Sequence, residues 1–531
     1  MKNSFIKGAF ILGMAGIIVK FIGAFFRIPL GRIIGSEGLG YYQAGYSVFN
    51  FLLAFTAAGL PTAISKLVSE KRVKGDYKGA HKVFKTAFFL LLGLGLVGTI
   101  VFALITSYLV NEIFKNPNAY YAVMALAPAL IFICLLAAFR GYFQGMKNMK
   151  PTATSQVVEQ LARVTIGLTL AVVLLNKLDV RFAAAGASFG ATAGGLFGLV
   201  IMLYIYQKQK NSIIPRDIEH IQVEEERTKQ IIKNILKISI PISIGAAVMP
   251  LINMLDTIVV IRRLQDIGFT TEEANSLFGQ LSGMATTMVN FPQVITVAIA
   301  MSVVPVISES AEIGKWDDVR EDTKSAVKLA LLIGLPAAVG LATLSHPIMA
   351  MLFPDEPASV GRILLFLSWA VIFLTQVQTL TGVLQGLGKP HIPVRNLIIG
   401  AGVKLVITYI LTGIEIINVL GGAIGTVSAY FVAFTLNLIA VKKETGVVFS
   451  KREFLLKPIL SAGIMGLIVL IVYHQLYPFL GNTIATLSSI VIGGITYGIM
   501  LLKTKTLGQV ELELLPGSKK IIKVLRHFKL I

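Results

Sequence analysis

The stretch that decides the fold runs from residue 86 to residue 110 and reads TAFFLLLGLGLVGTIVFALITSYLV. It contains no charged residue, and about 20 apolar residues are enough for a helix to cross the hydrocarbon core of a bilayer. Similar stretches recur along the whole chain. Apolar residues make up 55% of the 531 residues and charged residues 14%, where soluble domains carry about 25% charged residues. We therefore predict a polytopic membrane protein, and this composition excludes a soluble enzyme and a disordered chain.

Fourteen stretches are long and apolar enough to span the membrane, so we predict an all-α protein with 14 transmembrane helices. They fall near residues 5–30, 41–65, 86–110, 119–139, 155–176, 183–206, 235–261, 279–306, 325–345, 359–385, 394–414, 421–441, 457–475 and 480–502. When the N-terminus is placed inside, most Lys and Arg fall in inside segments, and the outside loops hold Arg32, Lys115, Lys177, Arg181, Arg262, Arg263 and Arg362. The positive-inside rule then predicts a multi-pass protein of the cell membrane with cytoplasmic N- and C-termini.

The formal net charge of +20 fits this topology. Lys and Arg in cytoplasmic loops face the anionic headgroups of membrane lipids, so we expect lipids and not nucleic acid as the partners of these charges.

An internal repeat divides the chain. GYFQG at 141–145, followed by Lys150-Pro151, recurs as GVLQG at 382–386, followed by Lys389-Pro390. Weaker matches pair residues 61–65 with 305–308 and 75–77 with 314–316, and all offsets lie between 239 and 244 residues. We predict an N-terminal lobe (1–207, spans 1–6), a cytoplasmic linker (208–234), a C-terminal lobe (235–441, spans 7–12) and two further helices with a cytoplasmic tail (442–531). The lobes are parallel repeats related by a pseudo-two-fold axis, which predicts a substrate path between them and alternating access.

Two motifs of nucleotide and metal chemistry are missing from the sequence. It has no P-loop and no His-Glu-x-x-His motif, and it has one cysteine, Cys134, in an apolar run. Gly-x-x-x-Gly pairs such as Gly190 with Gly194 and Gly421 with Gly425 indicate close helix packing. We therefore expect a carrier with no catalytic residue, no cofactor and no metal.

A few ionisable residues lie within the predicted spans, where each costs about 2.5–3.5 kcal/mol on insertion scales and usually serves a function. Lys20 and Arg27 are seven residues apart on one face of span 1, and no acid in that span offsets them. They favour an anion site, with snorkelling to the interface as the alternative for Arg27. Arg and Lys suit phosphate in particular.

Four further ionisable positions are candidates with open roles. Glu159 and Arg163 are spaced i, i+4 and form either a local ion pair or one wall of a binding cavity. Lys404 stands alone in span 11, the repeat partner of span 5, and is a candidate anion contact. Asp256 stands alone in span 7 and is a candidate ion-pair partner or a site for coupling to a proton or cation.

The segment Lys20-x-x-Gly23-x-x-x-Arg27-x-Pro29-Leu30-Gly31, followed by GSEGLGYY at 35–42, resembles the start of the polysaccharide-biosynthesis transporters. These belong to the multidrug/oligosaccharidyl-lipid/polysaccharide exporter superfamily, and the resemblance extends to the stage V sporulation protein B group of Gram-positive bacteria and its relatives, the lipid II flippases. It covers essentially the whole chain.

The resemblance implies a V-shaped carrier that moves undecaprenyl-pyrophosphate-linked sugars from the inner to the outer leaflet. It implies that Lys20, Arg27 and Glu37, which lie within the matching motif, bind substrate, and it extends less directly to Glu159, Arg163 and Lys404. It further implies a groove for the polyprenyl tail at spans 13 and 14, and the cell-wall synthesis machinery as a partner. One departure concerns span 8: the Gram-negative lipid II flippases carry an Arg before a Phe-Pro, whereas no cation precedes Phe291-Pro292 here.

The leading hypothesis is a flippase for an undecaprenyl-pyrophosphate-linked glycan, foremost the peptidoglycan precursor lipid II, in cell wall or spore cortex synthesis. The alternatives are a flippase for another polysaccharide precursor and a cation-coupled multidrug exporter of the same superfamily. A membrane-bound glycosyl or phosphoglycosyl transferase would need acidic metal-binding pairs, for which Glu272-Glu273 and Asp317-Asp318 are the candidates.

Overall fold

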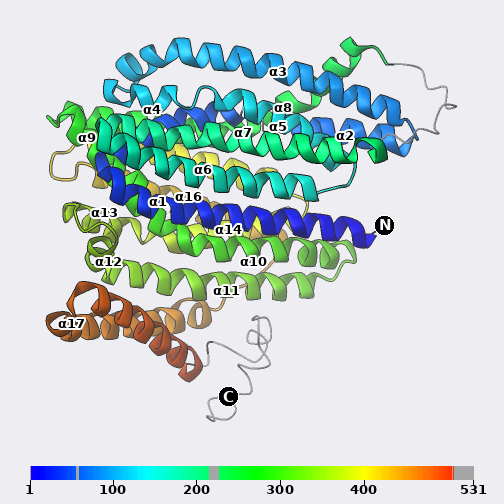
Figure 1. Cartoon of the computed structure of the whole chain (residues 1–531). Helices are drawn as coiled ribbons and strands as arrows, with labels where there is room; N and C mark the ends of the chain where they lie inside the picture. Colours follow the sequence, from blue (N-terminus) through cyan, green and yellow to red (C-terminus); the bar gives the residue numbers. More distant parts are fainter. Residues whose placement is uncertain (1, 55–58, 214–225, 505, 507–531) are drawn as a thin grey trace. The chain divides into compact units, whose positions relative to one another are not determined.

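A computed structural model describes residues 2–54, 59–213, 226–504 and 506, and all regular elements within these ranges are helices (Figure 1). Twelve helical segments there are long and apolar enough to cross a membrane. Two of the twelve contain one residue outside the helical conformation: Gly35 in α1 (Lys2–Leu53), with φ of 65°, and Gly481 in α17 (Lys457–Lys503), with φ of 69°. Such a φ favours a residue without a side chain. Each glycine splits its segment into two legs, so the twelve segments give 14 spans, as predicted. Residues 55–58 of predicted span 2 lie outside the described residues.

Some expectations concern residues that the structure does not describe. Residues 214–225 of the predicted linker and 507–531 of the predicted tail lie outside the described residues. The cytoplasmic location of both termini stays a prediction. Residues 31–40, expected to link spans 1 and 2, are helical on both sides of Gly35, so the turn between the spans is a single residue.

The chain divides into two compact units, Met1–Gly279 and Gln280–Ile531. The first unit contains α1, α2 (Leu60–Val73), α3 (Tyr77–Tyr108), η2 (Leu109–Ile113), η3 (Pro117–Ala119), α4 (Tyr120–Met124), α5 (Ala129–Gly145), α6 (Lys150–Lys177), α7 (Val180–Ile213), α8 (Thr228–Asp266) and α9 (Thr271–Gly279). Packing assigns α8 and α9 to this unit because both contact α1. The predicted second lobe starts earlier, at residue 235, because the sequence repeat and not packing sets its boundary. The predicted lobe boundaries therefore stay a prediction.

The second unit carries the remaining helices. They are η4 (Gln280–Ala285), α10 (Thr286–Glu312), α11 (Trp316–Thr343), α12 (Ser345–Leu352), α13 (Ser359–Leu367), α14 (Ala370–Gly386), α15 (His391–Thr412), α16 (Leu420–Thr445), η5 (Arg452–Leu456) and α17. Its best-buried apolar cluster joins α10, α11, α14 and α16, and includes Ile307, Val383 and Val441. The two legs of α17 pack on α11 and α12.

The predicted repeat is visible in the backbone of the two units. In the turn after α2, Gly75 N donates to Arg72 O and the φ of Gly75 is 75°. In the turn after α10, Gly314 N donates to Ala311 O and the φ of Gly314 is 74°. The two turns are therefore equivalent, at an offset of 239 residues.

Glycine packing corrects one detail of the predicted repeat. A Cβ added to Gly141 of α5 would lie 2.8 Å from the carbonyl oxygen of Pro61, and one added to Gly382 of α14 would lie 2.7 Å from that of Ala300. Pro61 is thus equivalent to Ala300 and not to Pro305. The match of residues 61–65 with 305–308 is wrong in register by about one helical turn, because the identity of a few side chains does not fix which residues face the partner helix.

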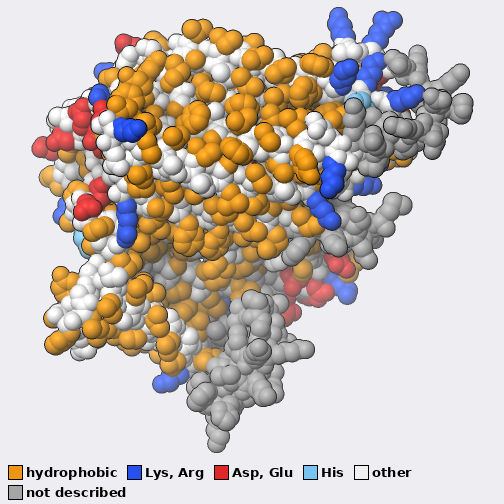
Figure 2. Space-filling view, viewed as in Figure 1, with side chains coloured by type: hydrophobic (Ala, Val, Ile, Leu, Met, Phe, Trp, Pro, Cys, Tyr) orange, Lys and Arg blue, Asp and Glu red, His pale blue; other side chains and the backbone are white. Residues whose placement is uncertain are grey.

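The surface of the first unit fits a membrane environment. Large apolar side chains of α3 are exposed, among them Phe89 at 58% and Leu104 at 75%. Figure 2 shows hydrophobic side chains over this face, with Lys and Arg gathered at the α2 end and acidic side chains at the α9 end. The exposed apolar band is the surface that lipid chains would cover.

Candidate substrate-binding site

The two cations of α1 share a face that packs toward α6. Gly23 lies between Lys20 and Arg27 on this face, and a Cβ there would lie 3.2 Å from Nε2 of Gln160. The Lys20 side chain is exposed, and within the described ranges its ammonium has no ion-pair or hydrogen-bond partner. Arg27 is half-buried and lies within electrostatic reach of Tyr42 in the second leg of α1.

The carboxylate of Glu159 is held between two arginines. Arg163 Nη2 donates to Glu159 Oε1 at 3.0 Å, as the i, i+4 spacing predicts. Arg140 Nη2 donates to Glu159 Oε2 at 2.7 Å, and Arg140 Nε donates to Ser155 Oγ at 3.1 Å. Glu159 is 15% exposed, so this is a largely buried cluster of two positive charges and one negative charge. The predicted pair of Glu159 and Arg163 is present. It belongs to a cluster of three residues with Arg140, and the net charge of this cluster is positive.

Close packing of α7 on α6 fixes the backbone that carries this cluster. A Cβ on Gly190 would lie 2.5 Å from the carbonyl oxygen of Arg163, and one on Gly194 would lie 2.6 Å from that of Glu159. Only glycine allows so close an approach of two helices. The side chains of Glu159 and Arg163 therefore stand on a rigid two-helix support, and the Gly-x-x-x-Gly pair predicted to serve packing does so.

Aromatic side chains from the second leg of α1 adjoin the cluster. The rings of Tyr42 and Tyr46 lie 4.4 Å apart between centroids, and both residues interact electrostatically with Arg163. Arg163 Nε, Tyr46 Oη and Gln156 Oε1 are buried, and none of these atoms has a hydrogen-bond partner within the described residues. Buried polar atoms are usually satisfied. A donor pair of Arg163 Nε and Tyr46 Oη fits an anionic ligand with oxygen acceptors.

Glu37 lies outside this cluster. Its carboxylate accepts a hydrogen bond from Tyr41 Oη at 2.8 Å, and no Lys or Arg of the described residues pairs with it. Its main-chain oxygen accepts a hydrogen bond from Asn275 Nδ2 of α9 at 2.7 Å. The binding role that the resemblance implies for Glu37 stays a proposal, while its observed contacts tie α1 to α9.

Small residues bring α1 and α9 together around Glu37. Ser36 Oγ and Ser276 Oγ lie 2.7 Å apart. A Cβ added to Gly279 would overlap the carbonyl oxygen of Ser36, and one added to Gly40 would overlap that of Asn275. At this contact α1 and α9 approach so closely that neither Gly40 nor Gly279 has room for a side chain.

The other two predicted positions lie in different units. Asp256 is half-buried on α8 of the first unit. Lys404 is half-buried on α15 of the second unit, where it interacts electrostatically with Tyr430 of α16. The packing of Gly425 of α16 against Thr408 and the Lys404 carbonyl parallels that of Gly190 against Gly167 and the Arg163 carbonyl. Lys404 is thus the repeat counterpart of Arg163.

The acidic pairs proposed for a transferase are engaged locally. Glu273 Oε2 accepts hydrogen bonds from Thr270 N and Thr270 Oγ1, while Glu273 N donates to Thr270 Oγ1, which forms a capping box at the start of α9. Asp317 pairs with Arg320 at 2.7 Å, and Asp318 lies 3.9 Å from Lys315. Helix capping and surface pairing account for these acids.

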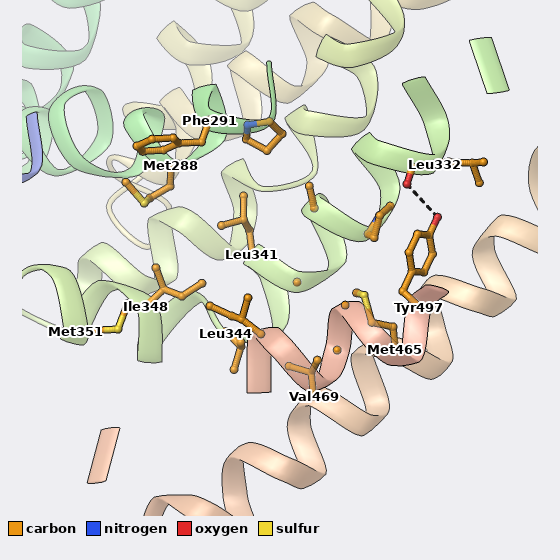
Figure 3. Close-up of a pocket in the computed structure, with 17 residues that line it drawn as sticks. Met288, Phe291, Leu332, Leu341, Leu344, Ile348, Met351, Met465, Val469 and Tyr497 are labelled. Carbon is orange, nitrogen blue, oxygen red and sulfur yellow. Dashed lines mark hydrogen bonds between the residues drawn. The ribbon is translucent and has the colours of Figure 1, made fainter. Parts of the chain in front are cut away.

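An apolar groove lies within the second unit, between α10, α11, α12 and α17. Its volume is about 510 Å³, and it is lined mainly by aliphatic and Met side chains with Phe291 and Tyr497. Figure 3 shows these side chains pointing into the groove, with Tyr497 Oη donating to the carbonyl oxygen of Leu332 at 3.1 Å. With the hydroxyl of Tyr497 satisfied, the groove presents mainly apolar surface and suits an apolar chain.

Comparisons with known proteins agree with this architecture. Residues 5–311 match the family described as "Polysaccharide biosynthesis protein", and residues 280–410 match the MatE family. Stage V sporulation protein B of Bacillus subtilis (strain 168) is 29% identical over 455 residues, covering 86% of this chain and 87% of that protein. Lipid II flippase MurJ of the same strain is 26% identical over 488 residues, covering 89% of each.

Solved structures show the same fold. Lipid II flippase MurJ in an inward closed conformation superimposes with a TM-score of 0.66 at 18% identity, over 92% of this chain and 97% of that chain. An inward-facing multidrug resistance MATE family transporter of the MOP superfamily superimposes with a TM-score of 0.66 at 17% identity, over 80% of this chain and 94% of that chain.

The resemblance noted in the sequence is confirmed, as is the prediction of a multi-pass membrane protein with a transporter fold. The match over residues 5–311 covers more than half of the chain, and the chain therefore belongs to the polysaccharide biosynthesis protein family.

Proposed function

We propose that this protein is a flippase that moves an undecaprenyl-pyrophosphate-linked glycan, foremost lipid II, from the inner to the outer leaflet by alternating access. One observation carries the proposal: the first unit holds Lys20, Arg27, Arg140 and Arg163 in or beside its spans, and these four cations outnumber the carboxylates of Glu37, Glu159 and Asp256 there. An excess of positive charge in apolar surroundings attracts a compact anion, and paired Arg and Lys donors suit pyrophosphate.

Each charged group has a distinct part in this proposal. Lys20 and Arg27 contact the pyrophosphate directly, since Lys20 is exposed and α1 places both on one face. Glu159 holds the guanidinium groups of Arg140 and Arg163 in place, so that Arg163 Nε and Tyr46 Oη face the ligand as donors. Lys404 adds a positive charge from the second unit, and Glu37 acts next to the turn at Gly35, between the two legs of α1.

The groove of the second unit supports the lipid part of the substrate. A polyprenyl chain is a long, branched hydrocarbon, and the groove between α11 and α17 is lined by hydrocarbon side chains. Because the chain leaves a bilayer that is equally apolar, close van der Waals packing in the groove, and not removal from water, would stabilise the complex. The groove therefore suits the tail of the proposed substrate, while the cationic cluster of the first unit suits its headgroup.

The membrane potential is a source of driving force for such a substrate. Moving one negative charge outward across an inside-negative membrane is favoured by about 2.3 kcal/mol per 100 mV. We further propose that both termini are cytoplasmic, and that the protein serves cell wall or spore cortex synthesis together with the cell-wall synthesis machinery.

A complementation assay tests the proposal. In a bacterial strain depleted of its own lipid II flippase, the wild-type chain should restore growth and the appearance of lipid II in the outer leaflet. The double variant Lys20→Ala/Arg27→Ala should fail at equal membrane abundance. Lys85→Ala, which removes an exposed cation from α3, is the matched control and should rescue fully. Rescue by the double variant would contradict the anion-site assignment.

A second candidate is multidrug export, favoured by the match of residues 280–410 to the MatE family. Such an exporter would bind cationic drugs through acidic groups, and Asp256 is the candidate in α8. Under this alternative, expression should raise drug resistance, and Asp256→Asn should abolish the resistance while Lys20→Ala/Arg27→Ala leaves it unchanged.

A further inference from the structure

A small polar cavity lies in the first unit where α2 and α5 end and α3 begins. Its volume is about 220 Å³. The residues that line it and bear on its chemistry are Ser69, Arg72, Val73, Tyr77, Met146 and Lys147. It is separate from the cluster around Glu159 and has no part in the proposed transport mechanism.

The guanidinium of Arg72 is fixed at this cavity by two contacts. Arg72 Nη1 donates to the carbonyl oxygen of Met146 at 3.2 Å, and the guanidinium lies over the ring of Tyr77, 5.4 Å from its centroid. Within the described residues no carboxylate pairs with Arg72. Its remaining N–H groups are held in place and available to a ligand in the cavity.

The nearby acids are taken by another cation. Lys71 lies 3.1 Å from Glu226 and 3.5 Å from Asp76, and Asp76 Oδ1 also accepts the N–H of Gly79 at 2.6 Å. Burial opposes the charged form of Lys71, but these two carboxylates outweigh it and raise the pKa of the ammonium above its usual value. Both acids thus pair with Lys71, and neither forms an ion pair with Arg72, whose guanidinium faces the cavity.

Lys147 adopts a backbone conformation that favours glycine. Its φ is 60°, and its N–H donates to Gln144 O at 2.9 Å. In the equivalent turn of the second unit the residue is Gly388, with φ of 73°, and its N–H donates to Gln385 O. A long side chain at such a position is strained, and strain of this kind points to a functional constraint on that side chain.

The second unit supplies an internal comparison. The matched turns after α2 and α10 place Ala311 at the position of Arg72, and Gly388 stands at the position of Lys147. Both cations of the cavity are therefore absent from the repeat copy, although the backbone of each turn is the same. The charges are not needed to form either turn.

The chemistry of the cavity suits a phosphate group at a membrane surface. A fixed guanidinium, an exposed ammonium and the hydroxyl of Ser69 are donors to phosphate oxygens. Val73 of the same lining is 80% exposed, which gives the cavity an apolar edge beside its cations. Basic pockets between membrane helices recognise lipid headgroups in this way. We propose that this cavity binds the phosphate of an anionic phospholipid headgroup.

Lipid binding by the purified full-length protein tests the proposal. Native mass spectrometry in detergent would measure bound phosphatidylglycerol, with phosphatidylcholine and inorganic phosphate as comparison ligands. Arg72→Gln and Lys147→Gly remove the two cations, and glycine at 147 keeps the turn because Gly388 forms the same turn in the repeat copy. Lys74→Gln removes an exposed cation of the same loop that does not line the cavity.

We expect phosphatidylglycerol to bind the wild type and Lys74→Gln with equal affinity. Its affinity for each cavity variant should be roughly fivefold lower, because each variant loses the attraction of one cation for an anionic lipid. Phosphatidylcholine should show no such dependence. Equal binding of phosphatidylglycerol to Lys147→Gly and the wild type would overturn the proposal. Binding of inorganic phosphate that depends on Arg72 and Lys147, without any such dependence for phosphatidylglycerol, would overturn the assignment to lipid.

Discussion

Helices α6 and α15 are repeat partners that share their packing and differ in their charges. Each packs against a glycine of the following helix, Gly190 for Arg163 and Gly425 for Lys404. One turn before Arg163 stands Glu159, whereas one turn before Lys404 stands Gly400. A Cβ at Gly400 would lie 2.5 Å from the carbonyl oxygen of Ala429, so the second unit has no room for a side chain there. The backbone packing repeats, and the carboxylate that stabilises the arginines belongs to the first unit alone.

The same contrast extends to the two candidate binding regions. The first unit carries a charged and aromatic cluster around Glu159 and Tyr46, and the second unit carries the apolar groove beneath Tyr497. Under the proposed function the first unit offers headgroup chemistry and the second unit offers a surface for the tail. Four substitutions can break or sharpen this comparison.

The largest effect is expected from Glu159→Gln. It leaves two largely buried guanidinium groups without their shared carboxylate, and breaking a buried ion pair in this way costs about 3–5 kcal/mol. The thermal unfolding midpoint of the purified protein should fall steeply and rescue should be lost. Glu70→Gln is the control, because Glu70 pairs with Lys66 on an exposed surface, where a pair contributes about 1 kcal/mol or less. Equal stability of the two variants would show that the triad does not hold α5 to α6.

Gly279→Ala should have the next largest effect. The new methyl group would overlap the carbonyl oxygen of Ser36 and force α9 away from α1, at a cost of about 1–3 kcal/mol. Thermal unfolding measures the loss. Gly245→Ala on α8 meets no atom within 4 Å and should instead stabilise the helix by about 0.5–1 kcal/mol. A Gly279→Ala variant as stable as Gly245→Ala would rule out the tight approach of the two helices.

Gly494→Leu tests the groove of the second unit. Gly494 lines the groove and has no atom within 4 Å of an added Cβ, so leucine would fill the space without a clash. The new side chain should displace part of a bound tail and so weaken substrate affinity, because the packing contacts of that part are lost. Gly498→Leu, one turn further along α17, also meets no atom and lies outside the groove. The measurement is the affinity of each variant for a polyprenyl-linked substrate. Equal affinities of Gly494→Leu and Gly498→Leu would contradict the binding of the tail in the groove.

The smallest effect is expected from Lys404→Ala. If Lys404 adds one positive charge to the attraction of an anionic substrate, its loss should reduce transport roughly fivefold, the scale of a single charge contact of about 1 kcal/mol. Lys443→Ala, which removes an exposed cation near the end of α16, is the matched control. Equal transport rates of Lys404→Ala and Lys443→Ala would show that Lys404 does not attract the substrate, and that only cations of the first unit do so.

The fold is largely predictable from the sequence because membrane spans are set by long apolar stretches. The 14 spans, the repeat and the role of Gly190 and Gly194 in packing follow from composition and spacing. The register of the repeat does not, since Pro61 is equivalent to Ala300 and only helix contacts reveal this. The sharp turns at Gly35 and Gly481 also escape prediction, because a single residue of unusual φ leaves no periodic signal.

The candidate site is predictable only in part. The i, i+4 spacing of Glu159 and Arg163 predicts their pair, but Arg140 escapes because it falls where a span gives way to a Lys-rich loop and reads as a loop cation. The available signal is that Arg140 directly follows the apolar residues 129–139, and the helix that they form continues to Gly145. Tyr42 and Tyr46 belong to the stretch that carries the family resemblance, but the sequence does not link them to Arg163, and only the fold brings them there.

Transport in reconstituted vesicles tests the central claim most directly. Purified protein in liposomes with a fluorescent undecaprenyl-pyrophosphate-linked glycan would report the rate at which the glycan crosses between leaflets. We predict that the wild type and Lys85→Ala exchange the lipid at equal rates and that Lys20→Ala/Arg27→Ala exchanges it no faster than protein-free vesicles. A double variant that moves the lipid at the wild-type rate would show that the cations of the first helix do not bind its pyrophosphate.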